Sequence, residues 1–144
     1  MCSRFSPSFL LRGDEDVTLP LEDKVACVIG REELIKAQEN LSYSFVFKFN
    51  QSVDCQTRSL CAEGAKRIMH IFHHEMHRLT DVFALERCTD WSWMRGICST
   101  CVEHAQLRHK RGRRAVWKLL PQIFGFGSWE EIQKAEQHWN DDWS

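Results

Sequence analysis

Four of the seven cysteines in this 144-residue chain occur as two pairs, and these pairs constrain the fold more than any other feature. Cys98 and Cys101 form a Cys-x-x-Cys motif, and five residues separate Cys55 from Cys61. Structural zinc takes four thiolate or imidazole ligands in a tetrahedron, and a two-residue gap lets both thiols of a pair reach one ion. The sequence therefore predicts one zinc ion bound by Cys55, Cys61, Cys98 and Cys101, joining two segments that are distant in sequence.

Other interpretations of the cysteines stay open. Cys88 or His104 is an alternative fourth ligand. A further alternative is that Cys27, Cys55 and Cys88 are small buried hydrophobic residues, and for Cys27 this is the expectation. A redox Cys-x-x-Cys motif usually follows a strand of a βαβ unit. Here the motif follows an aromatic turn at 90–95 and Gly96, which favours metal binding over redox chemistry.

The composition indicates one folded domain. Hydrophobic residues make up 43% of the chain, with six Trp and nine Phe, which suffices for a packed core. We expect residues 1–21 to be a loose lead-in and residues 22–144 to form a single zinc-bound domain. The net charge of −1 provides no global attraction for nucleic acid or membranes. Neither a membrane-spanning run nor a signal peptide is visible, so reduced thiols in the cytoplasm or nucleus are expected.

Apolar periodicity predicts four helical segments. The first covers residues 22–40 and is weakened by Gly30, and a long helix follows over 62–88. A second long helix over 98–120 is expected to end at Pro121. Ser128 and Glu131 have the spacing of a capping box, which predicts a last helix to about residue 139.

The segment 43–49 alternates aromatic residues with smaller ones and predicts a half-buried strand. The expected fold class is therefore α+β but mostly α: two long helices and a capped C-terminal helix around a short aromatic strand or hairpin, stapled by one zinc. We also expect an aromatic cluster near the C-terminus, formed by residues 119–121, Phe124, Phe126 and Trp129.

Histidines at positions 70, 73, 74 and 77 suggest a metalloprotease motif, but the spacing fails. A His-Glu-x-x-His motif needs two residues after the Glu, and His74-Glu75-Met76-His77 has one. On a helical projection these histidines lie opposite the apolar face, so a hydrated stripe is expected.

A basic run covers residues 108–114 and contains Arg108, Lys110, Arg111, Arg113 and Arg114. It is typical of a nuclear-import or nucleic-acid contact patch. The alternative is a solvated helical face that pairs with the acidic end of the chain at 130–142.

The sequence contains no Gly-rich phosphate loop, no Gly-x-Ser-x-Gly motif and no kinase signature. A Cys–His pair such as Cys101 and His104 lacks a third group to orient it. We therefore expect a non-enzyme.

The order of motifs resembles a known protein family. The shared features are the two cysteine pairs and the ending Gly112-Arg113-Arg114-x-x-Trp117-x-x-Leu120-Pro121-x-x-Phe124-Gly125, followed by Ser128-Trp129-Glu130-Glu131. This ending resembles the C-terminal zinc-binding-like region of BTB- and F-box-type proteins of mushroom-forming basidiomycete fungi. Residues 1–21 are too short for a BTB or F-box module, so the resemblance implies the zinc-bound tail without the adaptor role of that module.

Together these features predict a non-enzymatic, zinc-stabilised protein-interaction module, an adaptor or regulatory tail with a protein partner. The alternative is a nuclear, nucleic-acid-associated protein that uses the basic run at 108–114.

Overall fold

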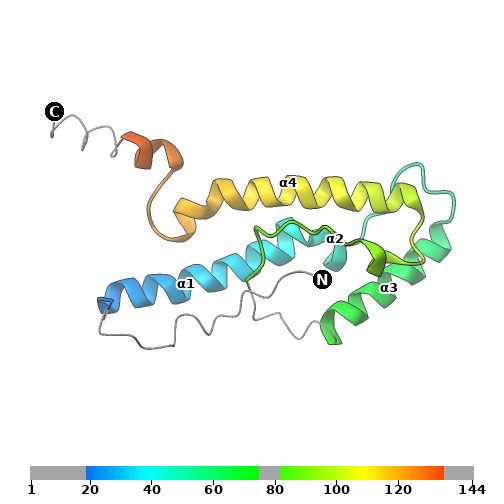
Figure 1. Cartoon of the computed structure of the whole chain (residues 1–144), viewed down its shortest axis with the longest axis horizontal. Helices are drawn as coiled ribbons and strands as arrows, with labels where there is room; N and C mark the ends of the chain where they lie inside the picture. Colours follow the sequence, from blue (N-terminus) through cyan, green and yellow to red (C-terminus); the bar gives the residue numbers. More distant parts are fainter. Residues whose placement is uncertain (1–18, 75–81, 135–144) are drawn as a thin grey trace.

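The computed structural model describes residues 19–74 and 82–134, and its secondary structure within these ranges is helical. The elements are α1 (Leu21–Ala37), the π-helix η2 (Gln38–Ser42), α2 (Ser44–Phe47), α3 (Arg58–His74), the 3-10 helix η3 (Ser92–Met94) and α4 (Ser99–Ile123). Figure 1 shows α1 and α4 side by side and running in opposite directions, with α3 near the start of α4. No helix in the described ranges is long and apolar enough to cross a membrane.

The predicted strand at 43–49 is wrong, and with it the α+β class, because residues Ser44–Phe47 form helix α2 and no strand occurs in the described residues. The alternation of aromatic and smaller residues does not mark one buried and one solvated face. Tyr43, Phe45 and Val46 are all buried, and so are Ser42 and Ser44 between them. A segment covered on all sides must satisfy its backbone groups locally, which a helix does and a lone strand cannot.

Helix α4 lies directly against η2, at the junction between α1 and α2. A Cβ atom at Gly112 would lie 2.7 Å from Cα of Ser42 and closer still to the carbonyl group of Leu41. Only glycine allows α4 to lie this close to the backbone of η2. Gly112 therefore fixes the crossing point of the two helical segments.

The long helix predicted over 62–88 does not extend as far toward the C-terminus as expected. α3 covers Arg58–His74, whereas residues 82–91 form an irregular segment that contains Cys88. A hydrogen bond from a side chain of α4 to the backbone of this segment holds the two together. Arg113 Nε donates to the carbonyl of Leu85 at 2.8 Å. The main core lies between α2, α3, η3 and α4 and includes Phe45, Ile68 and Met94.

Pro121 does not end α4, contrary to the prediction, because the helix continues to Ile123. Proline has no N–H to donate to the carbonyl four residues earlier, which here belongs to Trp117. The indole Nε1 of Trp129 donates to that carbonyl instead, at 2.8 Å, and the two indoles stack with centroids 4.9 Å apart. The side chain of Trp129 thus replaces the missing helical hydrogen bond.

The predicted capping box is confirmed. Glu131 N donates to Ser128 Oγ at 3.2 Å, and Ser128 N donates to the Glu131 carboxylate at 2.6 Å. The predicted C-terminal aromatic cluster does not form as one unit. Phe126 is exposed, and Phe124 packs against α1.

Helix α1 is continuous through Gly30, so this glycine does not interrupt it. A Cβ atom at Gly30 would lie 2.6 Å from Cδ1 of Phe124, which explains why glycine occupies this position. The apolar side predicted for α1 is buried only in its second half, at Leu34 and Ala37. Leu21, Val25, Val28 and Ile29 remain exposed.

Candidate metal centre

The four paired cysteines come from the segments that precede and begin two helices. Cys55 lies in the loop before α3 and Cys61 in its first turn, while Cys98 is the N-cap of α4 and Cys101 lies in its first turn. Gly96, with a positive φ of 88°, turns the chain from η3 into α4. The segments that were predicted to converge therefore do so.

The four Sγ atoms lie within 4.8 Å of one another and could hold a metal ion. Cys98 Sγ and Cys55 Sγ are 3.8 Å apart. Four sulfur atoms at about 2.3 Å from one ion in a tetrahedron would be roughly 3.8 Å apart. The observed separations are thus close to those of a tetrahedral thiolate site, with a contraction of about 1 Å needed at the widest pair.

Three of the four cysteines are buried and Cys98 is half-buried, and backbone amides donate to sulfur atoms of the cluster. Cys61 and Cys101 are almost fully inaccessible to solvent. Ser52 N–H donates to Cys101 Sγ at 3.4 Å, and Cys98 N–H donates to Cys61 Sγ at 3.3 Å. Such donors stabilise negative charge on sulfur and orient metal ligands. The hydroxyl of Thr57 also lies 3.4 Å from Cys61 Sγ. The sequence did not predict the contacts of Ser52 and Thr57, because no pattern of residue types encodes them.

The pKa values of the Cys98 and Cys101 thiols are shifted in opposite directions. Hydrogen bonds to Cys98 Sγ, first from the backbone of Cys101 and then from the neighbouring thiols, lower the pKa of Cys98 to about 6. Burial raises the pKa of Cys101. Cys98 is thus ionised at neutral pH, whereas Cys101 keeps its proton until a bound cation replaces it.

The alternative ligands lie outside the cluster. Cys88 Sγ donates to the carbonyl of Asp90 at 3.2 Å, and His104 Nδ1 is 3.2 Å from the carbonyl of Asn50. Cys27 is exposed, so the expectation that it is buried is wrong. Among the described residues only Cys55, Cys61, Cys98 and Cys101 form a group suited to a metal.

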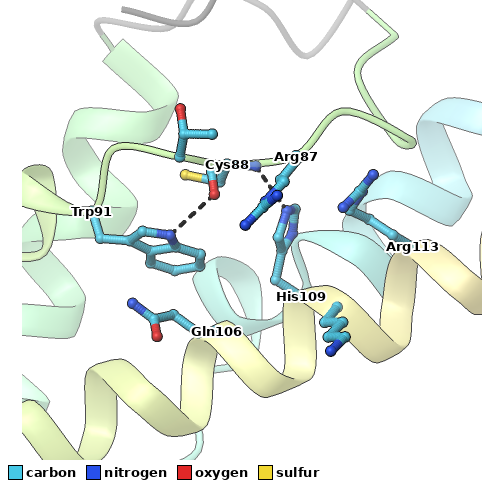
Figure 2. Close-up of a pocket in the computed structure, with 8 residues that line it drawn as sticks. Arg87, Cys88, Trp91, Gln106, His109 and Arg113 are labelled. Carbon is cyan, nitrogen blue, oxygen red and sulfur yellow. Dashed lines mark hydrogen bonds between the residues drawn. The ribbon is translucent and has the colours of Figure 1, made fainter.

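The basic run divides between the interior and the surface. Arg108 donates to the carbonyl of Lys48 at 2.9 Å and to Ser44 Oγ at 3.2 Å. His109 is buried, and its Nε2 accepts the N–H of Cys88 at 3.1 Å, as Figure 2 shows. Its Nδ1 therefore carries the proton and donates to the carbonyl of Ser42 at 2.8 Å. Lys110, Arg111 and Arg114 are exposed.

The predicted histidine stripe is only partly within the described residues. His70 is exposed, as expected for a solvated face. The side chains of His73 and His74 and the whole of His77 lie outside what the structure describes. The predicted partners of the basic run at Glu136, Asp141 and Asp142 also lie outside it.

Comparisons with known protein families, with curated proteins and with solved structures return no match. The resemblance to the C-terminal region of fungal BTB- and F-box-type proteins therefore stays a prediction.

Proposed function

We propose that the chain is a non-enzymatic, zinc-stabilised protein-interaction module. The observation that carries the proposal is the convergence of four Sγ atoms within 4.8 Å. Four thiolates complete a tetrahedron and leave no position for water or substrate, which is typical of structural rather than catalytic zinc. Soft sulfur ligands also select zinc over magnesium or calcium.

Zinc at this position would hold α3 and α4 together at their N-terminal ends. It would tie the loop before α3 to the beginning of α4, two segments about 40 residues apart. The free energy of metal binding then contributes to folding, because the unfolded chain has no preformed site. The resemblance to a fungal tail region supports the same role.

The surface that we assign to a protein partner is the exposed first half of α1 and the groove beside it. Leu21, Val25, Val28 and Ile29 recur at the spacing of one helical face and remain exposed. A groove of about 630 Å³ between α1 and α4 is lined by apolar residues that include Ile29, Leu119 and Ile123.

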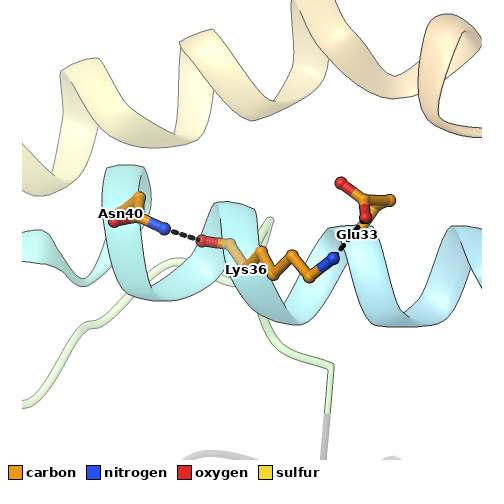
Figure 3. Close-up of polar contacts among 3 residues, drawn as sticks. All are labelled: Glu33, Lys36 and Asn40. Atoms are coloured by element: carbon orange, nitrogen blue, oxygen red, sulfur yellow. Dashed lines mark hydrogen bonds and ion pairs between the residues drawn. The ribbon is translucent and has the colours of Figure 1, made fainter.

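Polar residues of α1 also line this groove. Lys36 Nζ pairs with the Glu33 carboxylate at 2.6 Å, and Asn40 Nδ2 donates to the Lys36 carbonyl at 2.9 Å, as Figure 3 shows. An apolar strip with a polar rim suits an amphipathic helix from another protein, docked by its apolar face.

Site-specific photo-cross-linking tests this surface. A photoreactive residue at Val28 is expected to capture one discrete partner, and the matched control is the same residue at the exposed Lys66 on α3. Capture at Val28 should be lost when Leu21 and Val25 are both replaced by Ser. Equal capture at the two positions, or a second copy of the chain as the captured protein, would contradict the proposal.

A further inference from the structure

Two adjoining cavities follow one side of α4. The first, of about 570 Å³, lies between α4 and the segment 87–91. The second, of about 730 Å³, lies farther along α4 beside Trp117. Lys110 and Arg113 line both cavities, so the two form one continuous surface, here called the α4 cationic groove.

Five cations line the α4 cationic groove, and no carboxylate from the described residues does. The cations are Arg87, Lys110, Arg113, Arg114 and Lys118. The ion pairs found in the described part of the chain, Lys36–Glu33 and Lys66–Glu63, involve none of them. The nearby carboxylate of Asp90 accepts a hydrogen bond from Ser92 N at 2.9 Å. Arg113 also donates from Nε to the carbonyl of Leu85. A concentration of positive charge that has no acidic partner among the described residues indicates an anionic ligand.

Figure 2 shows how the first cavity is arranged: Trp91 and Gln106 lie at one end and Arg113 at the other, with Arg87 and His109 between them. Burial lowers the pKa of His109, so its imidazole is uncharged at neutral pH. The positive charge of this cavity therefore comes from Arg87, Arg113 and Lys110.

Each cavity also has an indole side chain. Trp91 lines the first cavity, and its Nε1 donates to the carbonyl of Cys88 at 3.1 Å, which fixes its orientation. Trp117 lines the second cavity and is 53% exposed, because Trp129 stacks on only one of its faces. Gln106 and Thr89 add hydrogen-bonding groups to the first cavity.

We propose that the α4 cationic groove binds a short stretch of single-stranded nucleic acid. The cations contact successive phosphates, and bases stack against Trp91 and Trp117. An acidic peptide would use the cations but leave both indole surfaces without a matching planar group. A duplex keeps its bases stacked internally and cannot offer them to the cavities. Lys110 and Lys118 are eight positions apart on the helix, about 12 Å, which limits the site to a few nucleotides.

The site differs from the basic run predicted from sequence. Arg108 of that run bonds inside the protein, and Arg111 lines neither cavity. Arg87, Lys118 and the two indoles come from outside the run. Binding in the α4 cationic groove requires neither a bound metal nor the groove beside α1.

Fluorescence anisotropy with a labelled 12-nucleotide oligo(dT) tests the proposal on the full-length reduced protein. With about three to five phosphate contacts, the affinity should fall roughly 20- to 100-fold between 50 and 200 mM salt. Replacing two exposed cations together, Lys110→Gln with Arg114→Gln, should weaken binding roughly tenfold or more at 50 mM salt and flatten the dependence of log K on log salt by about 1.4. Lys118→Gln is a second, independent variant expected to act in the same direction.

The matched control removes the same charge elsewhere: Lys24→Gln with Arg111→Gln should leave most of the binding intact. An abasic oligonucleotide of equal length should bind roughly tenfold or more weakly, because it cannot stack. Equal loss in both double variants would overturn the proposal. So would equal affinity for the abasic strand, or tighter binding of an acidic or phosphorylated peptide at the same salt concentration.

Discussion

Replacing Gly112 by Ala is expected to destabilise the protein, although alanine is the better helix former. In an exposed helix the change would stabilise by about 1 kcal/mol. Here the added Cβ would meet the backbone of Leu41 and Ser42, and neither can move aside as a flexible side chain can. Ordinary contact would require α4 and η2 to separate by roughly 1 Å.

The magnitude follows from two opposing contributions. Overpacking costs about 1–3 kcal/mol, and backbone-to-backbone overlap places Gly112→Ala at the upper end. Separation of the helices would also strain the hydrogen bond from His109 to the carbonyl of Ser42. After subtracting the helix-propensity gain, we expect a net loss of about 2 kcal/mol, or a melting temperature lower by roughly 4–8 °C.

Thermal unfolding followed by circular dichroism measures this loss. Two variants serve as controls: Arg111→Ala, at the adjacent exposed position, should change stability by less than about 0.5 kcal/mol. Gly30→Ala should cost less than Gly112→Ala, because the Phe124 ring that it meets is a side chain and can rotate away. A Gly112→Ala protein as stable as the wild type would refute the close approach of α4 to η2.

Two further predictions concern titrating groups. Burial lowers the pKa of His109, so below about pH 6.5 the unfolded chain binds a proton that the folded chain does not. As the pH falls below this value, the free energy of unfolding of the wild type should decrease by up to about 1.4 kcal/mol per pH unit. The His109→Gln variant, compared at equal metal content, should not show this decrease. Urea unfolding at pH 7.5, 6.5 and 5.5 measures this, and parallel pH profiles would contradict it. In the metal-free reduced protein, Cys98, with its pKa of about 6, should react with iodoacetamide at pH 7 before Cys101, whose pKa is raised. Fragment mass spectrometry distinguishes the two sites, and alkylation of Cys101 first would show that the acidities are wrongly assigned.

The parts of the structure that sequence patterns predicted are those set by local chemistry. The capping box at Ser128 and Glu131 requires only neighbouring residues, and it forms as predicted. The convergence of the two cysteine pairs was predicted from the ligand geometry of one ion, with a helix that leaves the first pair and a turn that returns to it.

The errors arose where tertiary contacts override local patterns. Alternating aromatics at 43–49 look the same whether one side or all sides are covered, and only the packing of α3 and α4 distinguishes the two cases. Pro121 continues α4 because a tryptophan eight residues later supplies the missing donor. A helix spreads the basic run over a wide arc, but only the tertiary contacts show that Arg108 points inward and Lys110 outward.

Metal analysis of the protein purified under reducing conditions tests the proposed zinc site. We expect one zinc per chain, lost in Cys98→Ser and retained in Cys27→Ser and Cys88→Ser, whose thiols lie outside the cluster. Protein that is reduced and folded but free of zinc, or zinc that persists in Cys98→Ser and disappears in Cys88→Ser, would contradict it.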